Sequence, residues 1–283
     1  MQDIQTRYTR EVSAEEHKQH LKNLHVYGYT QVHGGLHEGV SKQLKEKIDH
    51  IYEQTRTIAY QGRPDRDVDD RMIYNLQNKD KIFIDILDES CVRVILMEML
   101  NDPYYRFLPP EEPNYILGYY NARTSGKSLD LHIDSGIPAP GDRTWCMQVA
   151  FVLEDMTEEN GCTIVVPGSH LTGEYTDREL HNVKSLHAKA GDILLWDSRL
   201  WHGTRENTTK ESRWALIATI KMWWMKQSMD MTRSLSQEMY EQLTPRQKVL
   251  LGFCSIPPKD EMGRINTKTG YESLLLQVKD YYL

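Results

Sequence analysis

The stretch Leu131-His132-Ile133-Asp134 places an imidazole and a carboxylate two residues apart. In an extended strand, side chains at positions i and i+2 point to the same face, so His132 and Asp134 are expected to face one point in space. Two histidines and one carboxylate, with open positions opposite, form the metal-binding triad of non-haem Fe(II) oxygenases. The stretch therefore predicts two ligands of a metal site, although a His-x-Asp triplet alone also fits a hydrogen-bonded pair at a strand end.

A third ligand is available downstream, in Trp201-His202-Gly203-Thr204. The turn at Gly191-Asp192 leads into an expected strand directly before the His202 strand. In an antiparallel jelly roll this order brings His202 back beside the first two ligands. We therefore predict that His132, Asp134 and His202 bind the metal and carry the catalysis.

Arg213 follows His202 by eleven residues, across the turn-rich segment 205–210. If the two flanking strands are adjacent and antiparallel, Arg213 lies next to the His202 strand and points inward. Thr204 shares the face of His202 by strand periodicity. A guanidinium can bind a carboxylate bidentately, so the set suits a dicarboxylate such as 2-oxoglutarate, which chelates the metal with its other end. Taken alone, an arginine in a strand is usually a solvated or ion-paired surface residue, so the shared spacing of these residues carries the prediction.

The pattern of apolar residues changes after Pro109-Pro110. Before it, helices are expected over about 13–24, 40–54 and 79–100, with a short strand at 28–32 and an exposed loop at 59–72. After it, besides the His132 strand, short strands are expected at 115–120, 145–153, 162–166, 183–188, 192–196, 200–204 and 213–224. From about residue 234 the pattern is helical again, most clearly over 237–251. Many short strands without helices between them indicate an antiparallel jelly roll.

The sequence therefore predicts a mainly β protein in one domain over residues 1–283. Its β core is expected at about 110–226, braced by helices from 13–101 and 234–283. A net charge of −7 argues against a general nucleic-acid or anionic-membrane binder. The four cysteines are scattered, so a zinc–thiolate site or a disulfide framework is not expected. Without a secretory signal or a membrane-length apolar run, we expect a cytoplasmic protein with a small-molecule partner.

Two further motifs carry a family resemblance: Glu159-Asn160-Gly161-Cys162 and Val166-Pro167-Gly168-Ser169-His170. Together with His132-Ile133-Asp134, His202-Gly203-Thr204 and Arg213, in this order, they resemble the phytanoyl-CoA dioxygenase family over roughly residues 15 to 225. The resemblance implies a double-stranded β-helix, Fe(II), O2 and 2-oxoglutarate as co-substrate.

The resemblance also implies a role for each matching residue. His132, Asp134 and His202 would be the iron ligands. Arg213 would hold the distal carboxylate of 2-oxoglutarate with help from Thr204, and Gln148 would face the co-substrate. We interpret His170 as a structural loop residue.

The activity that the resemblance implies is hydroxylation, or another oxidation, of an unactivated C–H bond in a small metabolite, with release of succinate and CO2. Desaturation, cyclisation and endoperoxide formation stay open. Related halogenases replace the carboxylate ligand with a small residue, so Asp134 argues against halogenation. The alternative is a catalytically inactive jelly-roll binding or regulatory protein. Zinc hydrolysis is disfavoured because no general base stands out and Arg213 would lack a role.

Substrate identity and oligomeric state are not determined by this sequence. Tyr119, Trp145 and Trp201, together with Trp196, are candidate substrate-pocket residues, and each also fits a core position. The Gly- and Pro-rich segment 135–143 fits either a lid beside the metal or an ordinary connection.

Overall fold

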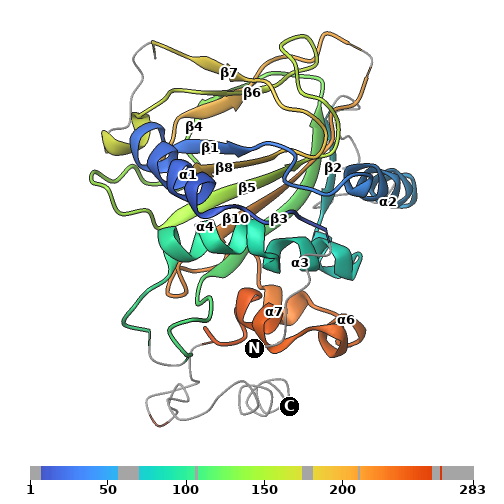
Figure 1. Ribbon diagram of the computed structural model, residues 1–283. Coiled ribbons are helices and arrows are strands. Elements are labelled where there is room, and N and C mark those ends of the chain that lie inside the picture. Colours follow the sequence, from blue (N-terminus) through green and yellow to red (C-terminus); the bar gives the residue numbers. More distant parts are fainter. Residues whose placement is uncertain are drawn as a thin grey trace.

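The computed structural model describes residues 8–56, 70–105, 108–173, 181–209, 211–256 and 262. Two antiparallel sheets form the β core, which confirms the predicted double-stranded β-helix (Figure 1). The six-stranded sheet has the order β1-β8-β5-β10-β3-β2 and the four-stranded sheet the order β4-β9-β6-β7. The strands are β1 (Tyr29–Val32), β2 (Asp70–Tyr74), β3 (Ile116–Ser125), β4 (Leu129–His132), β5 (Cys146–Val152), β6 (Thr163–Val165), β7 (Lys184–Leu186), β8 (Ile193–Asp197), β9 (His202–Thr204) and β10 (Ala215–Lys221).

Helices cover the face of the six-stranded sheet that points away from the smaller sheet (Figure 1). The α-helices are α1 (Ala14–Tyr27), α2 (Val40–Thr55), α3 (Lys81–Asp88), α4 (Ser90–Leu100), α5 (Met231–Ser234), α6 (Gln237–Gln242) and α7 (Pro245–Leu250), and two short 3₁₀ helices are η1 (Leu76–Asn78) and η2 (Ser169–Leu171). Helix α1 begins at the predicted capping box, in which Ser13 and Glu16 satisfy each other's backbone N–H groups. No helix within the described ranges is long and apolar enough to cross a membrane.

The central strand β5 is covered on both faces, by the helices on one side and by the smaller sheet on the other. All seven of its residues are buried, which fits a strand covered on both faces. Met147, Val149 and Phe151 belong to the large apolar core under the helices. Ala150 and Val152 pack instead with residues of the smaller sheet. The inner part of the space between the two sheets is therefore bounded by buried residues, and polar side chains deep in it, such as Gln148, are shielded from water.

The predicted helix over 79–100 is two helices, and this prediction was wrong at Glu89. Glu89 has an extended backbone (φ −79°, ψ 158°) between α3 and α4. Its carboxylate accepts hydrogen bonds from the backbone N–H groups of Tyr8 and Thr9. The interruption between α3 and α4 thus coincides with a contact to a segment 80 residues away. The apolar periodicity of the sequence cannot show such a contact.

The predicted helix over 237–251 is also interrupted. Helix α6 ends before Leu243, and α7 begins with Pro245 after the N-cap Thr244. Thr244 and Gln247 form a capping box, and proline is favoured in the first turn of a helix but not in its interior. Pro245 and its capping box were present in the sequence, but the apolar residues continue at helical spacing on both sides of them, so the prediction joined the two helices.

The predicted loop at 59–72 mostly lies outside the described residues. Its last residues belong to β2, which pairs with β3 at the edge of the six-stranded sheet. Strand β3 itself runs five residues beyond the predicted end at 120, to Ser125. This extension adds two positions to the inner face of the sheet, Asn121 and Arg123.

Candidate metal centre and co-substrate pocket

The two predicted histidine ligands come together on adjacent strands. His132 is the last residue of β4 and pairs in register with His202 at the start of β9. Directly opposed side chains of an antiparallel pair are close neighbours, and the two imidazole centroids are 4.4 Å apart. The His202 strand therefore returns beside the His132 strand, as the sequence analysis predicted.

Asp134 reaches the same point, but not by strand periodicity. Strand β4 ends at His132, and Asp134 lies in the following turn. The backbone N–H groups of Asp134 and Ser135 both donate to the carbonyl oxygen of Ser198, each at 2.9 Å. Asp134 is therefore positioned by the loop between β8 and β9 rather than by the pleat of β4.

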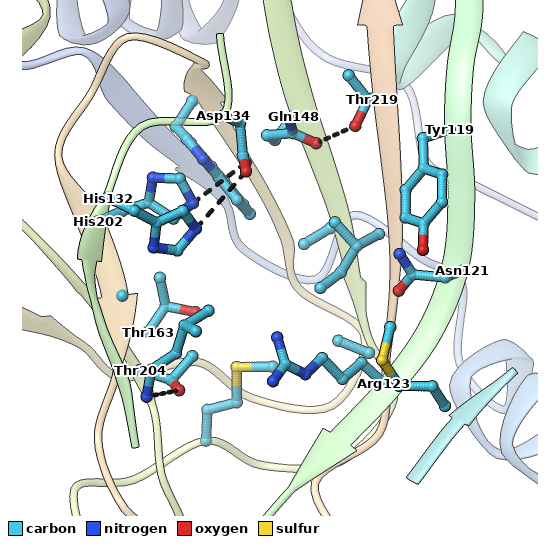
Figure 2. A pocket seen from close by; sticks show the side chains of 18 of the residues that line it. Tyr119, Asn121, Arg123, His132, Asp134, Gln148, Thr163, His202, Thr204 and Thr219 are labelled. Carbon is cyan, nitrogen blue, oxygen red and sulfur yellow. Dashed lines mark hydrogen bonds and ion pairs between the residues drawn. The ribbon is translucent and has the colours of Figure 1, made fainter. Parts of the chain in front are cut away.

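The three ligand atoms converge. Asp134 Oδ1 is 3.6 Å from His132 Nε2, and Asp134 Oδ2 is 3.2 Å from His202 Nε2 (Figure 2). One ligand atom from each residue lies within 4.8 Å of the other two. Two imidazole nitrogens and one carboxylate oxygen form the donor set of the facial triad that binds Fe(II), so the residues present fit this ion.

Both imidazoles are held in the tautomer that metal binding requires. His132 Nδ1 is 2.8 Å from the carbonyl oxygen of Asp130, and His202 Nδ1 is 2.9 Å from that of Leu200. A carbonyl can only accept, so each Nδ1 carries the proton and each Nε2 presents a lone pair. Metal-ligating histidines are commonly oriented by such second hydrogen bonds.

The ligands also stabilise one another electrostatically. Burial acts to raise the pKa of Asp134, but the interactions with His132 and His202 outweigh it and hold this pKa below its usual range. The nearby carboxylate of Asp134 raises the pKa of His132, while burial and the charge of Arg123 oppose this effect. A carboxylate that stays ionised at neutral pH is ready to bind a cation.

A cavity of about 280 Å³ extends from these ligands between the two sheets. Besides the three ligands, the lining includes Gln148, Thr204 and Arg213, which were the predicted co-substrate residues. Tyr119 and Trp196 also line the cavity, as do Asn121, Arg123 and Thr163, which the sequence analysis did not single out. Trp145 and Trp201 are described residues that do not line it: Trp145 packs against the large apolar core.

Arg213 enters the pocket from the opposite side to that expected. The prediction placed its strand next to the His202 strand, but β10 lies in the six-stranded sheet and β9 in the smaller one. Arg213 precedes β10 and is 4% exposed. Its backbone N–H donates to Thr124 Oγ1 at 2.9 Å. The pocket thus lies between Arg213 on one sheet and the Thr204 strand on the other.

Gln148 is fixed in orientation by two neighbours. Its Oε1 accepts a hydrogen bond from Thr219 at 2.8 Å (Figure 2). Its Nε2 donates to Ser198 Oγ at 3.3 Å. An amide NH2 has two donor hydrogens, so one remains for a ligand in the pocket. That Gln148 faces the co-substrate stays a prediction.

The motif residue His170 does not belong to the metal cluster. It is 3% exposed, and its Nε2 lies 3.3 Å from the carbonyl oxygen of His25. Burial lowers its pKa, which favours the neutral ring. These contacts agree with the predicted structural role of His170 between its loop and α1.

Gly161 of the Asn-Gly motif lies against Arg213. A Cβ atom at Gly161 would be 2.8 Å from the carbonyl oxygen of Arg205 and 3.1 Å from Arg213 Nε, and its φ is +89°. Neighbouring Asn160 fixes the turn, because its side chain accepts from the Thr157 N–H and donates to the Asp155 carbonyl. The absence of a side chain at position 161 therefore leaves the space that the guanidinium of Arg213 occupies.

We expect Gly161→Ala to weaken 2-oxoglutarate binding on the order of 10- to 100-fold, because displacing a positioning group by about 1 Å has effects of that size. Gly168→Ala is the matched control: its φ is +81°, but an added Cβ would meet only the Val26 carbonyl oxygen at 3.7 Å. Both variants carry the backbone strain of positive φ, roughly 1–2 kcal/mol. Calorimetric titration with 2-oxoglutarate should separate them; equal affinities in the two variants would rule out this role of Gly161.

The segment 135–143 is anchored at both ends. Ser135 is held by the Ser198 carbonyl, and Arg199 Nη1 donates to the carbonyl oxygens of Ala139 and Gly141 at 3.0 and 2.9 Å. Ile137 between these anchors is 68% exposed. The anchors favour a connection that is held next to the metal ligands at Ser135 and Ala139, while most of its other residues are exposed.

The fold and the ligand geometry define a class of protein: a double-stranded β-helix with a two-histidine, one-carboxylate centre is a non-haem Fe(II) oxygenase scaffold. Comparison with family models identifies the group within this class. The model described as phytanoyl-CoA dioxygenase (PhyH) matches residues 24–215. The chain belongs to the phytanoyl-CoA dioxygenase family.

Two of the curated proteins similar to this chain are dioxygenases by name. It is 36% identical to dioxygenase af480 of Aspergillus fumigatus over 142 residues, which are 48% of this chain and 46% of that protein. It is 28% identical to dioxygenase andF of Emericella variicolor over 144 residues, which are 48% of this chain and 50% of that protein. The matches thus span about half the length of these curated relatives.

Among solved structures, the chain is similar to HygX from Streptomyces hygroscopicus, determined with nickel, 2-oxoglutarate and hygromycin B bound. The TM-score is 0.59 at 16% sequence identity, covering 76% of this chain and 90% of that one. At this identity the likeness is one of fold.

Proposed function

We propose that this protein is an Fe(II)- and 2-oxoglutarate-dependent dioxygenase that oxidises a C–H bond of a small molecule and releases succinate and CO2. The observation that carries the proposal is the convergence of His132 Nε2, Asp134 and His202 Nε2, with both Nδ1 atoms held by backbone carbonyls. A structural zinc site would instead be closed by a fourth protein ligand. Among the residues that the structure describes, the cluster contains three.

The protein's part in this reaction is to bind and orient. His132, Asp134 and His202 would hold the iron, which when bound supplies the oxygen chemistry. Arg213 and Thr204 would hold the distal carboxylate of 2-oxoglutarate, and Gln148 would donate to its other end. The burial of His202, Gln148 and Arg213 limits access of water to the inner part of the pocket.

Two orphan polar atoms support a polar substrate rather than a plain hydrocarbon chain. Asn121 Oδ1 and Trp196 Nε1 are buried in residues that line the pocket, and neither has a hydrogen-bond partner within the described part of the chain. Leaving a buried donor or acceptor unsatisfied costs about 1–3 kcal/mol. A ligand that offers one donor and one acceptor would satisfy both atoms. We therefore propose a functionalised metabolite as substrate.

The primary test is anaerobic titration of the purified protein with Fe(II) and then 2-oxoglutarate, monitored by the visible charge-transfer band of the complex. The band should appear in the wild type, and succinate release then allows a substrate screen. Iron binding without a band would favour the alternative, a jelly-roll binding protein that retains the metal scaffold.

Arg213→Ala is expected to weaken 2-oxoglutarate binding by roughly 100-fold, since a charge-assisted bidentate contact is worth up to about 3 kcal/mol. Iron affinity should stay near that of the wild type because Arg213 is not one of the three metal ligands. The same titration gives both constants. If Arg213→Ala binds 2-oxoglutarate like the wild type, the assignment of this residue fails.

A further inference from the structure

The corner between β8 and β9 contacts several parts of the site at once. The backbone carbonyl oxygen of Ser198 accepts a hydrogen bond from the N–H of Asp134 at 2.9 Å. The carbonyl oxygen of Leu200 lies 2.9 Å from His202 Nδ1. The side-chain oxygen of Ser198 accepts from Gln148 Nε2 at 3.3 Å. One short segment therefore contacts two metal ligands and a residue of the co-substrate pocket.

This corner is itself held by neighbouring segments. Ser198 is fully buried, and its backbone N–H donates to the carbonyl oxygen of Cys146 on β5 at 3.0 Å. The N–H of Asp197 donates to the carbonyl oxygen of Gly28 at 2.9 Å, and the Asp197 carboxylate pairs with the Arg199 guanidinium. A group fixed in this way can hold a neighbouring side chain in one orientation before a ligand binds.

The hydroxyl of Ser198 has a partner on each side. It donates to Cys146 Sγ at 3.1 Å, so its oxygen is left to accept from the Gln148 amide. At the other end of that amide, the oxygen accepts from the Thr219 hydroxyl at 2.8 Å (Figure 2). Both ends of the amide are therefore held, and the second N–H hydrogen of Gln148 remains for a molecule in the pocket that Gln148 lines.

We propose that Ser198 is a positioning residue for co-substrate binding, whose hydroxyl holds the Gln148 amide in the orientation that meets 2-oxoglutarate. This inference rests on the proposed function and extends it to a residue that is not part of the pocket lining. The two contacts of Ser198 belong to different atoms, because the backbone carbonyl contacts the Asp134 turn and the hydroxyl contacts Gln148. Removing only the hydroxyl should therefore affect the co-substrate and not the metal.

The test is a double-mutant cycle of the wild type, Ser198→Ala, Gln148→Met and the double variant. Ser198→Ala removes one oxygen atom and keeps the backbone carbonyl, and Gln148→Met removes the amide at nearly constant side-chain length. Each protein is titrated anaerobically with Fe(II) and then with 2-oxoglutarate, and the charge-transfer band reports formation of the complex. Melting curves show that each variant is folded.

We expect Ser198→Ala to weaken 2-oxoglutarate binding about 3- to 10-fold, the size of one neutral hydrogen bond, and to leave Fe(II) affinity within about twofold of the wild type. Gln148→Met should weaken 2-oxoglutarate binding at least as much. In the Gln148→Met background, Ser198→Ala should change this affinity by less than about twofold, because the hydroxyl has lost the group that it holds.

The hydrogen bond itself is tested by NMR in the absence of metal and co-substrate. Isotope labelling of glutamine gives the side-chain NH2 signals, and the signal of Gln148 is identified by its loss in Gln148→Met. This signal should shift in Ser198→Ala. It should keep its position in the control Thr144→Val, which removes a buried hydroxyl that contacts the same corner through Asp197 at 2.8 Å. Thr144→Val should also bind 2-oxoglutarate like the wild type.

The proposal is overturned if folded Ser198→Ala binds 2-oxoglutarate within about twofold of the wild type, or if the Gln148 signal does not shift. It is also overturned if the effects of the two substitutions add, because Ser198 would then not act through Gln148. A parallel loss of Fe(II) affinity would place the effect at the metal ligands instead. Failure of the proposed function is distinct from these outcomes, because the wild type itself would then form no complex with 2-oxoglutarate.

Discussion

His202→Ala is expected to reduce iron binding and turnover to background. His202 supplies one of three ligand atoms, and it also pairs with His132 and contacts Asp134. Loss of an outer hydrogen-bond partner of a metal ligand costs roughly 10- to 100-fold in affinity or activity, and loss of the ligand itself should cost more. Fe(II) titration and succinate release measure the two effects.

His170→Ala is the matched control for this variant. His170 is 3% exposed and His202 is 6% exposed, so both substitutions remove a buried imidazole, but His170 lies outside the metal cluster. It should lower stability and keep iron binding in the folded protein. If His202→Ala bound Fe(II) as tightly as His170→Ala, the metal assignment would be wrong.

Arg199→Ala is expected to destabilise the protein by about 3–5 kcal/mol, the usual cost of removing one partner from a buried ion pair. Arg199 Nε and Nη2 donate to the two oxygens of Asp197 at 3.0 and 2.8 Å, and the side chains are 3% and 1% exposed. Without the guanidinium, Asp197 keeps the Thr144 hydroxyl and the Arg199 backbone N–H but no cation.

Urea denaturation of the wild type, Arg199→Ala and Arg205→Ala gives the comparison. Arg205 is an exposed arginine whose ion pair with Glu158 spans 3.6 Å, and removing an exposed pair should cost at most about 1 kcal/mol. Because Arg199 also holds the carbonyls of Ala139 and Gly141 next to the Asp134 turn, iron affinity should fall as well. A stability equal to that of Arg205→Ala would contradict the structural role of this pair.

Local signals in the sequence determined several elements correctly. The capping box at Ser13 and the apolar spacing of 40–54 predicted α1 and α2, because caps and helical periodicity act over three or four residues. Turn residues between short apolar runs predicted where the strands of the β core lie along the chain. The specific Asn-Gly and Pro-Gly-Ser-His motifs indicated the family, which the match over 24–215 confirms. The single-domain boundary at 1–283 stays a prediction.

The tertiary structure decided how the site is assembled. Asp134 is placed by the Ser198 carbonyl, 64 residues downstream. Arg213 lines the pocket from the segment before β10, which belongs to the other sheet than β9. Strand periodicity gives the face of a side chain but not which strands become neighbours, and β9 and β10 are consecutive in the chain yet lie in different sheets. Asn121 and Arg123 line the pocket because β3 continues to Ser125, where it pairs with β2 and β10. The residues of the metal centre could thus be predicted from the sequence. The partners that orient them could not, because they depend on hydrogen bonds between distant segments, and these bonds form only when the sheets pack.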